Sequence, residues 1–522
     1  MTTFEKIHEG RIVGKLTAVD RLIFKGHLTA LMPPGAFRRF LCSQGVLLKD
    51  FASYATRATE TLKENAERIA TEAGRPFEYL ESAHTAARGC SKEDRARAIA
   101  DRDQIVEGLV AVFRTLEPCM TFQVHGNRKT CRLEVSRKPG KCLAYYFYFV
   151  DKELGFMHVR VQSWFPFTIQ VYVNGREHLK KQLNHRCLGY KAYDNTLLSV
   201  EDLALTQDLA DKFVRRDWVG KLDAFARRVN PLLPQITKSG FGGYYWVVDQ
   251  CEVATDVMFK DRSALEAILP DLFETATLAF SAEDVLRFLG RKLHPALQAE
   301  VTSDHKRRPE GRRVKHRVGK NSIKMYDKYS VLRVETTINH PRDFKILKLQ
   351  DTDHGVVRRW VPMSKGVSNL WRYFQVGSGA NQRYLDAMAN VVPQGEGVRA
   401  LDDLCQSHVV EGRRVAKLAP LGPHDAELFR TVLRGEHLVH GLRNRDICNI
   451  PSPPSDTVVD ADERRRRCAR ISRQIAKLRG HGLLAKVQGC NLYRVTSKGQ
   501  RLMAAAVHVR DKDFPAALRA AA

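Results

Sequence analysis

The clearest periodic pattern of hydrophobic and polar positions lies near the C-terminal end, between residues 463 and 508. Apolar residues recur there at helical spacing and predict an amphipathic helix with one apolar stripe. The stripe consists of Cys468, Ile471, Ile475 and Leu478. Gly480 and Gly482 predict the end of that helix. The short runs 484–487 and 492–495 then predict a two-stranded ribbon.

The segments that flank this helix complete a recognisable order. Residues 425–434 and 442–447 predict two short helices before it, and Thr496 or Ser497 is placed to cap a closing helix after the ribbon. The order resembles the winged-helix domains of bacterial transcription regulators. The two phrases that carry this resemblance are Leu478-Arg479-Gly480-His481-Gly482-Leu483-Leu484 and Tyr493-Arg494-Val495-Thr496-Ser497-Lys498-Gly499. The resemblance implies a nucleic-acid-binding domain, with a purely structural role for its basic face as the alternative.

Period-two alternation in the middle of the chain predicts antiparallel strands. Three runs within 141–175 are separated by short links, and two more lie within 322–338. We therefore expect an α+β protein. Its predicted parts are a mainly helical N-terminal region (1–118), a central α+β region (119–400), a linker (401–424) and the winged-helix domain (425–522).

Charge changes the picture more than composition does. The chain has 522 residues and a net charge of +26, which favours a polyanionic partner through counterion release. No apolar run reaches the length of a membrane span, and the eleven cysteines include no CxxC pair. We therefore expect a cytoplasmic protein with reduced thiols that binds nucleic acid, with DNA favoured over RNA.

Two basic clusters are the candidate contacts for that polymer. The first follows the predicted C-terminal helix and consists of Arg464, Arg465, Arg466, Arg467, Arg470, Arg473 and Lys477. The second lies in 301–320, where Pro309 and Gly311 predict a loop that grips phosphate. Its cations are Lys306, Arg307, Arg308, Arg312, Arg313, Lys315 and Arg317. A solvated basic face and a surface loop are the structural alternatives.

A rival interpretation is an enzyme. The runs Asn321–Lys328 and Val331–Ile338 resemble the tyrosine-aspartate-lysine and arginine-x-glutamate strands of rolling-circle replication initiators and relaxases. The resemblance implies DNA nicking, as in a mobile-element protein, with Asp327 and Glu335 holding Mg²⁺ or Mn²⁺ and Tyr373 or Tyr384 as nucleophile. The chain lacks the HxH pair of that family, and cross-strand ion pairing of Asp327 is the structural alternative.

Two further groups of residues leave other roles open. The spacing of Asp249, Glu252 and Asp256 favours one face of a helix, with Mg²⁺ binding as the alternative. Aromatic residues of the predicted sheet could stack on bases in an RNA-binding ribonucleoprotein subunit, although aromatics in strands more often pack in cores. They are Tyr146, Tyr148, Trp164 and Phe165. No P-loop, GxGxxG, HExxH or GxSxG motif supports nucleotide-driven or hydrolase chemistry.

Overall fold

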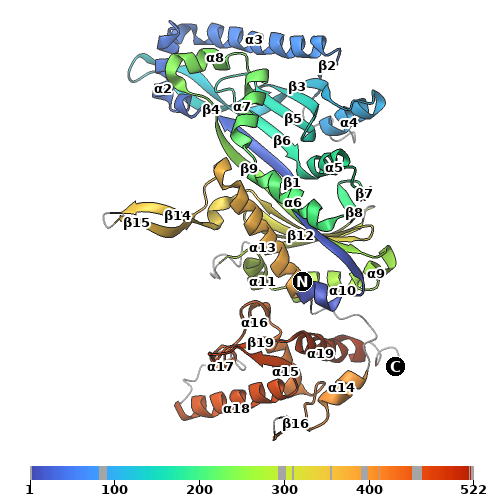
Figure 1. Ribbon diagram of the computed structural model, residues 1–522. Coiled ribbons are helices and arrows are strands. Elements are labelled where there is room, and N and C mark those ends of the chain that lie inside the picture. The colour runs from blue at the N-terminus through green and yellow to red at the C-terminus, as the bar shows by residue number, and fades with distance from the viewer. Residues whose placement is uncertain are drawn as a thin grey trace. The chain divides into compact units, whose positions relative to one another are not determined.

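The protein is a mixed α and β chain that divides into two compact units. The computed structural model describes residues 3–81, 91–291, 301–308, 311–352, 355–389, 398–410, 412–448, 461–515 and 518 (Figure 1). Unit 1 comprises 1–15, 255–336 and 378–522, and unit 2 comprises 16–254 and 337–377. Among these described residues, no helix combines the length and apolar character needed to cross a membrane.

Unit 2 is built on a sheet with the strand order β9-β1-β6-β5-β4-β3-β2. Its strands are β1 (Ile12–His27), β2 (Phe77–Tyr79), β3 (Gly108–Asn127), β4 (Arg132–Asp151), β5 (Gly155–Gln162), β6 (Ile169–Asn174) and β9 (Tyr245–Phe259). β3 to β6 pair antiparallel with their chain neighbours, as short links require. The predicted antiparallel strands of 141–175 are therefore confirmed.

Helices pack on this sheet and contribute to its core. They are α2 (Pro34–Ser43), α3 (Phe51–Glu72), α4 (Lys92–Arg102), α5 (Gly175–His185), α6 (Leu203–Arg215), α7 (Trp218–Val229) and α8 (Leu233–Ile236). The ring of Phe37 on α2 stacks on that of Phe122 on β3 at 4.1 Å, and Phe51 and Phe165 close the same cluster. Stacked and edge-on aromatic pairs of this kind add packing energy beyond area burial.

Unit 1 holds the other end of β1 and β9 and four more strands, in the order β10-β11-β12-β13-β9-β1. These strands are β10 (Val301–Arg308), β11 (Gly311–Val318), β12 (Asn321–Lys328) and β13 (Val331–Ile338). The strands predicted within 322–338 are thereby confirmed. The helices before the C-terminal segment are α1 (Thr3–Ile7), α9 (Arg262–Glu266), α10 (Leu269–Glu274) and α11 (Ala282–Phe288), and α13 (Leu370–Met388) belongs to both units.

The C-terminal segment of unit 1 has its own apolar core. Its elements are α14 (Val398–Leu404), β16 (His408–Val410), β17 (Arg413–Val415), α15 (Pro423–Val432), α16 (Gly435–His440), α17 (Asn444–Cys448), α18 (Ala461–Gly480), β18 (Leu484–Lys486), β19 (Tyr493–Val495) and α19 (Ser497–His508). Leu404 and Leu418 belong to this core, so 401–424 is not a linker, contrary to the prediction.

The N-terminal region is less helical than its pattern predicts. The long helix α3 fits a mainly helical region, but the long strand β1 precedes it. α4 ends at Arg102, and the long strand β3 begins at Gly108, within the region 1–118 that is predicted to be mainly helical. Residues 109–113 are buried without interruption, and such a run suits a covered central strand as well as a helix.

Candidate nucleic-acid interface

α18 packs through the apolar stripe that the sequence predicts. Ile471, Ile475 and Leu478 are buried in the C-terminal core, against residues of α15 and α19 such as Phe429 and Met503. Cys468 is half-buried, with its Sγ atom 3.1 Å from that of Cys448. One face of the helix is thus fixed against the domain, so the opposite face is held in a defined orientation.

That opposite face carries a row of arginines. Arg466, Arg470 and Arg473 follow one another at i, i+4 and i+7 and are all exposed, as is Arg465. Within the described part of the chain, no acidic side chain lies within ion-pair distance of Arg466, Arg470 or Arg473. Such a row suits an anionic polymer, because its positive potential is not neutralised by the protein.

The ends of α18 depart from the predicted row. Lys477 turns toward the domain, where its Nζ atom lies 3.1 Å from Asp425 Oδ2. Arg467 is half-buried, and the side chain of Arg464 lies outside the described residues. The acidic residues Asp462 and Glu463 occupy the first turn, where the helix dipole favours them. The exposed basic surface of α18 is therefore narrower than the sequence suggests.

A ribbon follows α18 at the turn that the glycines predict. Gly482 has a φ of +72°, and α19 begins after Thr496, whose hydroxyl accepts the amide hydrogen of Gly499. A β-carbon at Gly499 would lie 2.0 Å from Leu483 O, so only glycine allows this close approach of α19. β18 and β19 pair antiparallel and expose Lys486 and Arg494. The ribbon adds two cations to the arginine row of the same segment.

The second basic cluster is not a loop. Residues 301–308 and 311–318 form the antiparallel strands β10 and β11, and β11 also pairs with β12. Strand alternation then assigns the cations to two faces. Lys306, Arg313, Lys315 and Arg317 lie on one face, and Arg307 and Arg312 lie on the other. The side chain of Arg308 lies outside the described residues.

The first of these faces concentrates positive charge. Lys315 lies directly opposite Lys324 of β12, an arrangement of like charges that destabilises a sheet. Burial lowers the pKa of Lys315, and the neighbouring Arg317, Lys324 and Arg313 lower it further. Two acids offset part of this charge: Asp304 lies 3.3 Å from Arg313, and Glu335 lies 2.5 Å from Lys324.

Asp327 and Glu335 do not form a metal site together. Tyr326 and Lys324 both contact the Glu335 carboxylate, at 2.7 and 2.5 Å. Alternation along β12 places Asp327 on the other face, where it accepts a hydrogen bond from the Arg312 amide. The two carboxylates therefore point to opposite sides of the sheet, in agreement with the structural alternative of pairing within the hairpin.

Both candidate nucleophiles are enclosed by protein. Tyr373 and Tyr384 lie on the continuous helix α13, and neither side chain has measurable exposure. Burial raises the pKa of both phenols. The Tyr384 hydroxyl lies 3.2 Å from His316 Nε2, whereas the Tyr373 hydroxyl has no hydrogen-bond partner among the described residues. A polymer cannot reach either hydroxyl in this conformation.

The acidic residues Asp249, Glu252 and Asp256 lie on strand β9, so the helix reading is wrong. Asp256 is fully buried and binds the Arg333 guanidinium through both carboxylate oxygens, at 2.6 and 3.0 Å. Asp249 points to the other face of β9, 3.1 Å from Lys365 Nζ. Asp249 and Asp256 are therefore engaged in separate ion pairs.

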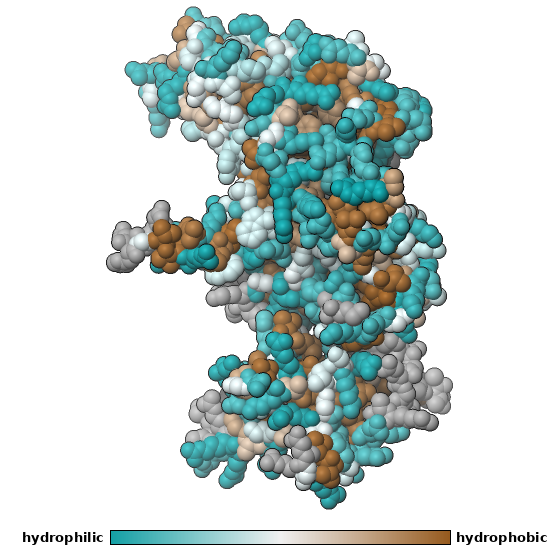
Figure 2. All heavy atoms as spheres, in the orientation of Figure 1, coloured by the Kyte–Doolittle hydropathy of each residue, from teal (hydrophilic) through white to brown (hydrophobic). Residues whose placement is uncertain are grey.

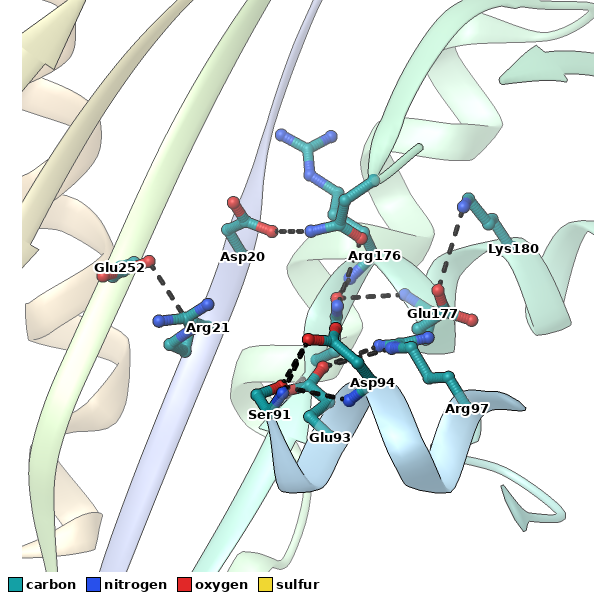
Figure 3. A network of polar contacts seen from close by, with 12 residues as sticks. Asp20, Arg21, Ser91, Glu93, Asp94, Arg97, Arg176, Glu177, Lys180 and Glu252 are labelled. Atoms are coloured by element: carbon teal, nitrogen blue, oxygen red, sulfur yellow. Dashed lines mark hydrogen bonds and ion pairs between the residues drawn. The ribbon is translucent and has the colours of Figure 1, made fainter. Parts of the chain in front are cut away.

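Glu252 takes part in a polar network of unit 2 (Figure 3). Its carboxylate lies within 4.8 Å of that of Asp20 on β1. Figure 3 shows Arg21 directed toward Glu252. The distance from Arg21 Nε to Glu252 Oε2 is 4.0 Å. The side-chain amide of Asn195 donates a hydrogen bond to Asp20. The buried Arg176 guanidinium donates to Ala254 O at 3.1 Å. Cationic and amide partners thus accompany the two carboxylates.

The aromatic residues considered for base stacking mostly pack inside unit 2. Tyr148 and Phe165 are buried, and the Trp164 indole donates to Phe122 O at 3.0 Å. Tyr146 is half-buried and donates its hydroxyl to Glu117 at 2.7 Å. These rings offer no open platform for bases.

One exposed element has no counterpart in the sequence predictions. β14 (Lys345–Thr352) and β15 (Gly355–Pro362) form a separate two-stranded ribbon in unit 2. Its signal in the sequence is a pair of runs rich in valine, leucine and isoleucine on either side of a short polar segment before Gly355, which is typical of a hairpin.

Comparison of the whole chain with protein-family models, curated proteins and solved structures finds no match.

Proposed function

We propose that this protein binds nucleic acid, with duplex DNA favoured, through a C-terminal domain of the winged-helix type. The observation that carries the proposal is the two-faced helix α18. Ile471, Ile475 and Leu478 anchor it, while Arg466, Arg470 and Arg473 form an exposed cationic row. The major groove of B-form DNA admits a helix of this kind, and arginine suits both phosphate and guanine contacts.

The arrangement around α18 supports a winged-helix type of domain. Leu442, between α16 and α17, forms an isolated antiparallel bridge with Tyr493 on β19. The order is thus helices, a short strand-like bridge, a helix, the basic helix α18 and a ribbon. In winged-helix domains the helix before the ribbon enters the groove, and the ribbon contacts the adjacent backbone. The β10–β11 hairpin is a second basic surface that would follow phosphates.

A nicking reaction is not part of this proposal. Tyr373 and Tyr384 are buried, and Asp327 and Glu335 lie on opposite faces of their hairpin. A ribonucleoprotein role is likewise not proposed from the aromatic strands, because their rings pack in the core. Duplex RNA is the polymer against which duplex DNA must be tested. We favour DNA, because the deep, narrow major groove of duplex RNA does not admit a helix such as α18.

The test compares the full chain with the variant Arg466→Ala/Arg470→Ala/Arg473→Ala on a labelled duplex of random sequence. Each phosphate contact contributes about 0.9 log units of affinity per decade of salt, so loss of three contacts lowers DNA affinity roughly 500-fold at 0.1 M salt, one decade below a 1 M reference. Arg38→Ala/Arg39→Ala/Arg57→Ala is the matched control, because it removes three exposed arginines from α2 and α3.

The same titration with duplex RNA of equal length separates the two polymers. We expect weaker RNA binding, with little further loss in the α18 variant. Equal losses in the α18 variant and in the control would contradict a specific role for α18. Preference for RNA that depends on Arg466, Arg470 and Arg473 would replace DNA with RNA in the proposal.

A further inference from the structure

The β14–β15 ribbon is an anchored arm whose outer part meets solvent. At its base Phe344, Ile346 and Met363 are buried, and Met363 N donates to Phe344 O at 2.8 Å. Arg372 on α13 donates to Lys345 O at 2.9 Å and stacks over the Trp360 ring. These contacts hold the ribbon by one end, so its direction from unit 2 is fixed.

One face of the arm exposes apolar side chains (Figure 2). Leu349 is 66% exposed and Trp360 is 55% exposed, which is unusual for large apolar residues on a well-paired strand. The pairing register places them on one face with Leu347 and Val356, because Leu347 lies opposite Trp360 and Val356 opposite Asp351. An exposed apolar face of this kind marks an interaction site rather than a packed surface.

The charges of the arm identify the partner. Its two strands carry the four cations Lys345, Lys348, Arg358 and Arg359 and one acid, Asp351. Lys348 lies directly opposite Arg359, which destabilises a free ribbon. Across the described residues, no acidic side chain pairs with any of these four cations. A second copy of the same arm would add like charge, whereas a polyanion would neutralise it.

We propose that the β14–β15 arm enters a groove of duplex DNA and is a further DNA-binding element, separate from α18 and from the β10–β11 hairpin. This inference rests on the proposed function. A two-stranded ribbon fits the major groove, and eight residue pairs give the arm a length of about 27 Å. Leu349 and Val356 contact base edges from the face that also carries Arg358, and Lys348 and Arg359 reach the flanking phosphates from the opposite face.

Photo-crosslinking in the full chain tests where the arm binds. p-Benzoylphenylalanine in place of Val356 reports the partner covalently, and the same group in place of Val106 is the control. Val106 is 79% exposed in unit 2, and its neighbour in the sequence is the acidic Glu107, so DNA is not expected to bind there. With a labelled 40-base-pair duplex, we expect a protein–DNA adduct from position 356 and none from 106. A protein–protein adduct would show that the arm binds a second copy, and no adduct would also overturn the proposal.

An affinity measurement separates failure of the arm from failure of the proposed function. Lys348→Ala/Arg358→Ala/Arg359→Ala lowers DNA affinity roughly 500-fold at 0.1 M salt, relative to a 1 M reference, if all three contact phosphates. Circular dichroism and thermal unfolding of this variant check that it folds. Trp360→Ala, which changes a residue next to the arm's anchor, is compared with it in the same measurements. If α18 substitutions weaken binding and the arm substitutions do not, only the arm is excluded. If the unmodified chain binds no nucleic acid, both proposals fail.

Discussion

The cations of α18 and those of the central strands β12 and β13 have opposite surroundings. Arg466, Arg470 and Arg473 are exposed, and within the described residues no acid pairs with them. Arg333 is buried against both oxygens of Asp256, and Lys324 lies 2.5 Å from Glu335. The same residue types therefore stabilise the fold in one region and remain available for a ligand in the other. The decisive difference is whether an acid lies within reach.

The comparison predicts its largest effect at Arg333. Arg333→Ala leaves the Asp256 carboxylate buried without its guanidinium, and we expect a loss of about 3–5 kcal/mol in the free energy of unfolding. Chemical denaturation followed by circular dichroism measures it. Arg333→Met/Asp256→Leu, which removes both charges, should be less destabilised than Arg333→Ala. Equal destabilisation would show that packing, rather than the uncompensated charge, dominates.

The pH dependence of stability tests His316, a buried base on β11, which pairs with β12. Burial lowers the pKa of His316 to about 4, below its usual value of 6.5. The unfolded chain therefore takes up a proton between pH 6.5 and 4 that the folded chain does not. Stability contributed by this group is complete above pH 6.5 and falls by roughly 3 kcal/mol by pH 4, since one pKa unit corresponds to about 1.36 kcal/mol.

The variant His316→Gln isolates that contribution. Its unfolding free energy should depend less on pH between 6.5 and 4 than that of the unmodified chain, whatever its stability at pH 7. An unchanged pH profile would show that other groups carry the acid sensitivity.

α18 itself contains both types of residue and allows a matched pair of substitutions. Ile475→Val removes one buried methylene and should lower stability by about 1 kcal/mol without changing DNA affinity. Arg470→Ala should lower DNA affinity and change stability by no more than about 0.5 kcal/mol, as exposed substitutions usually do. Thermal unfolding and a DNA-binding titration are measured for both variants. If Arg470→Ala lowers stability as much as Ile475→Val, the arginine row is structural.

The two tyrosines of α13 are expected to have small effects on stability and none on DNA affinity. Tyr384→Phe loses the contact with His316 and should cost about 1 kcal/mol, whereas Tyr373→Phe removes a buried hydroxyl without a described partner and should be neutral or stabilising. Thermal unfolding distinguishes them. Neither change should alter DNA affinity. Loss of a covalent DNA adduct in either variant would instead support nicking.

The sequence predicted correctly those features of α18 and α19 that depend on nearby residues. The stripe Ile471, Ile475 and Leu478 and the cap at Thr496 depend on residues within two helical turns, so the sequence alone was sufficient. The partner of Glu335 was not predictable in this way. It depends on the register of β12 against β13, and a shift of one residue would move every side chain to the other face.

Two errors have the same origin. β9 is buried on both faces from Cys251 to Phe259, so it lacks the alternation that identifies a strand, and its acids at i, i+3 and i+7 resemble a helix face. β10 and β11 are so rich in charge that the segment resembles a loop, yet pairing with β12 makes it a hairpin. Tertiary pairing overrode the local pattern in both segments.

The salt dependence of DNA binding tests the central claim most directly. For the full chain and for Arg466→Ala/Arg470→Ala/Arg473→Ala, the logarithm of the affinity is plotted against the logarithm of the salt concentration. We predict that the slope becomes shallower by between 2 and 3, since each lost phosphate contact removes about 0.9. An unchanged slope in a folded variant would contradict the assignment of α18 as the nucleic-acid-binding helix.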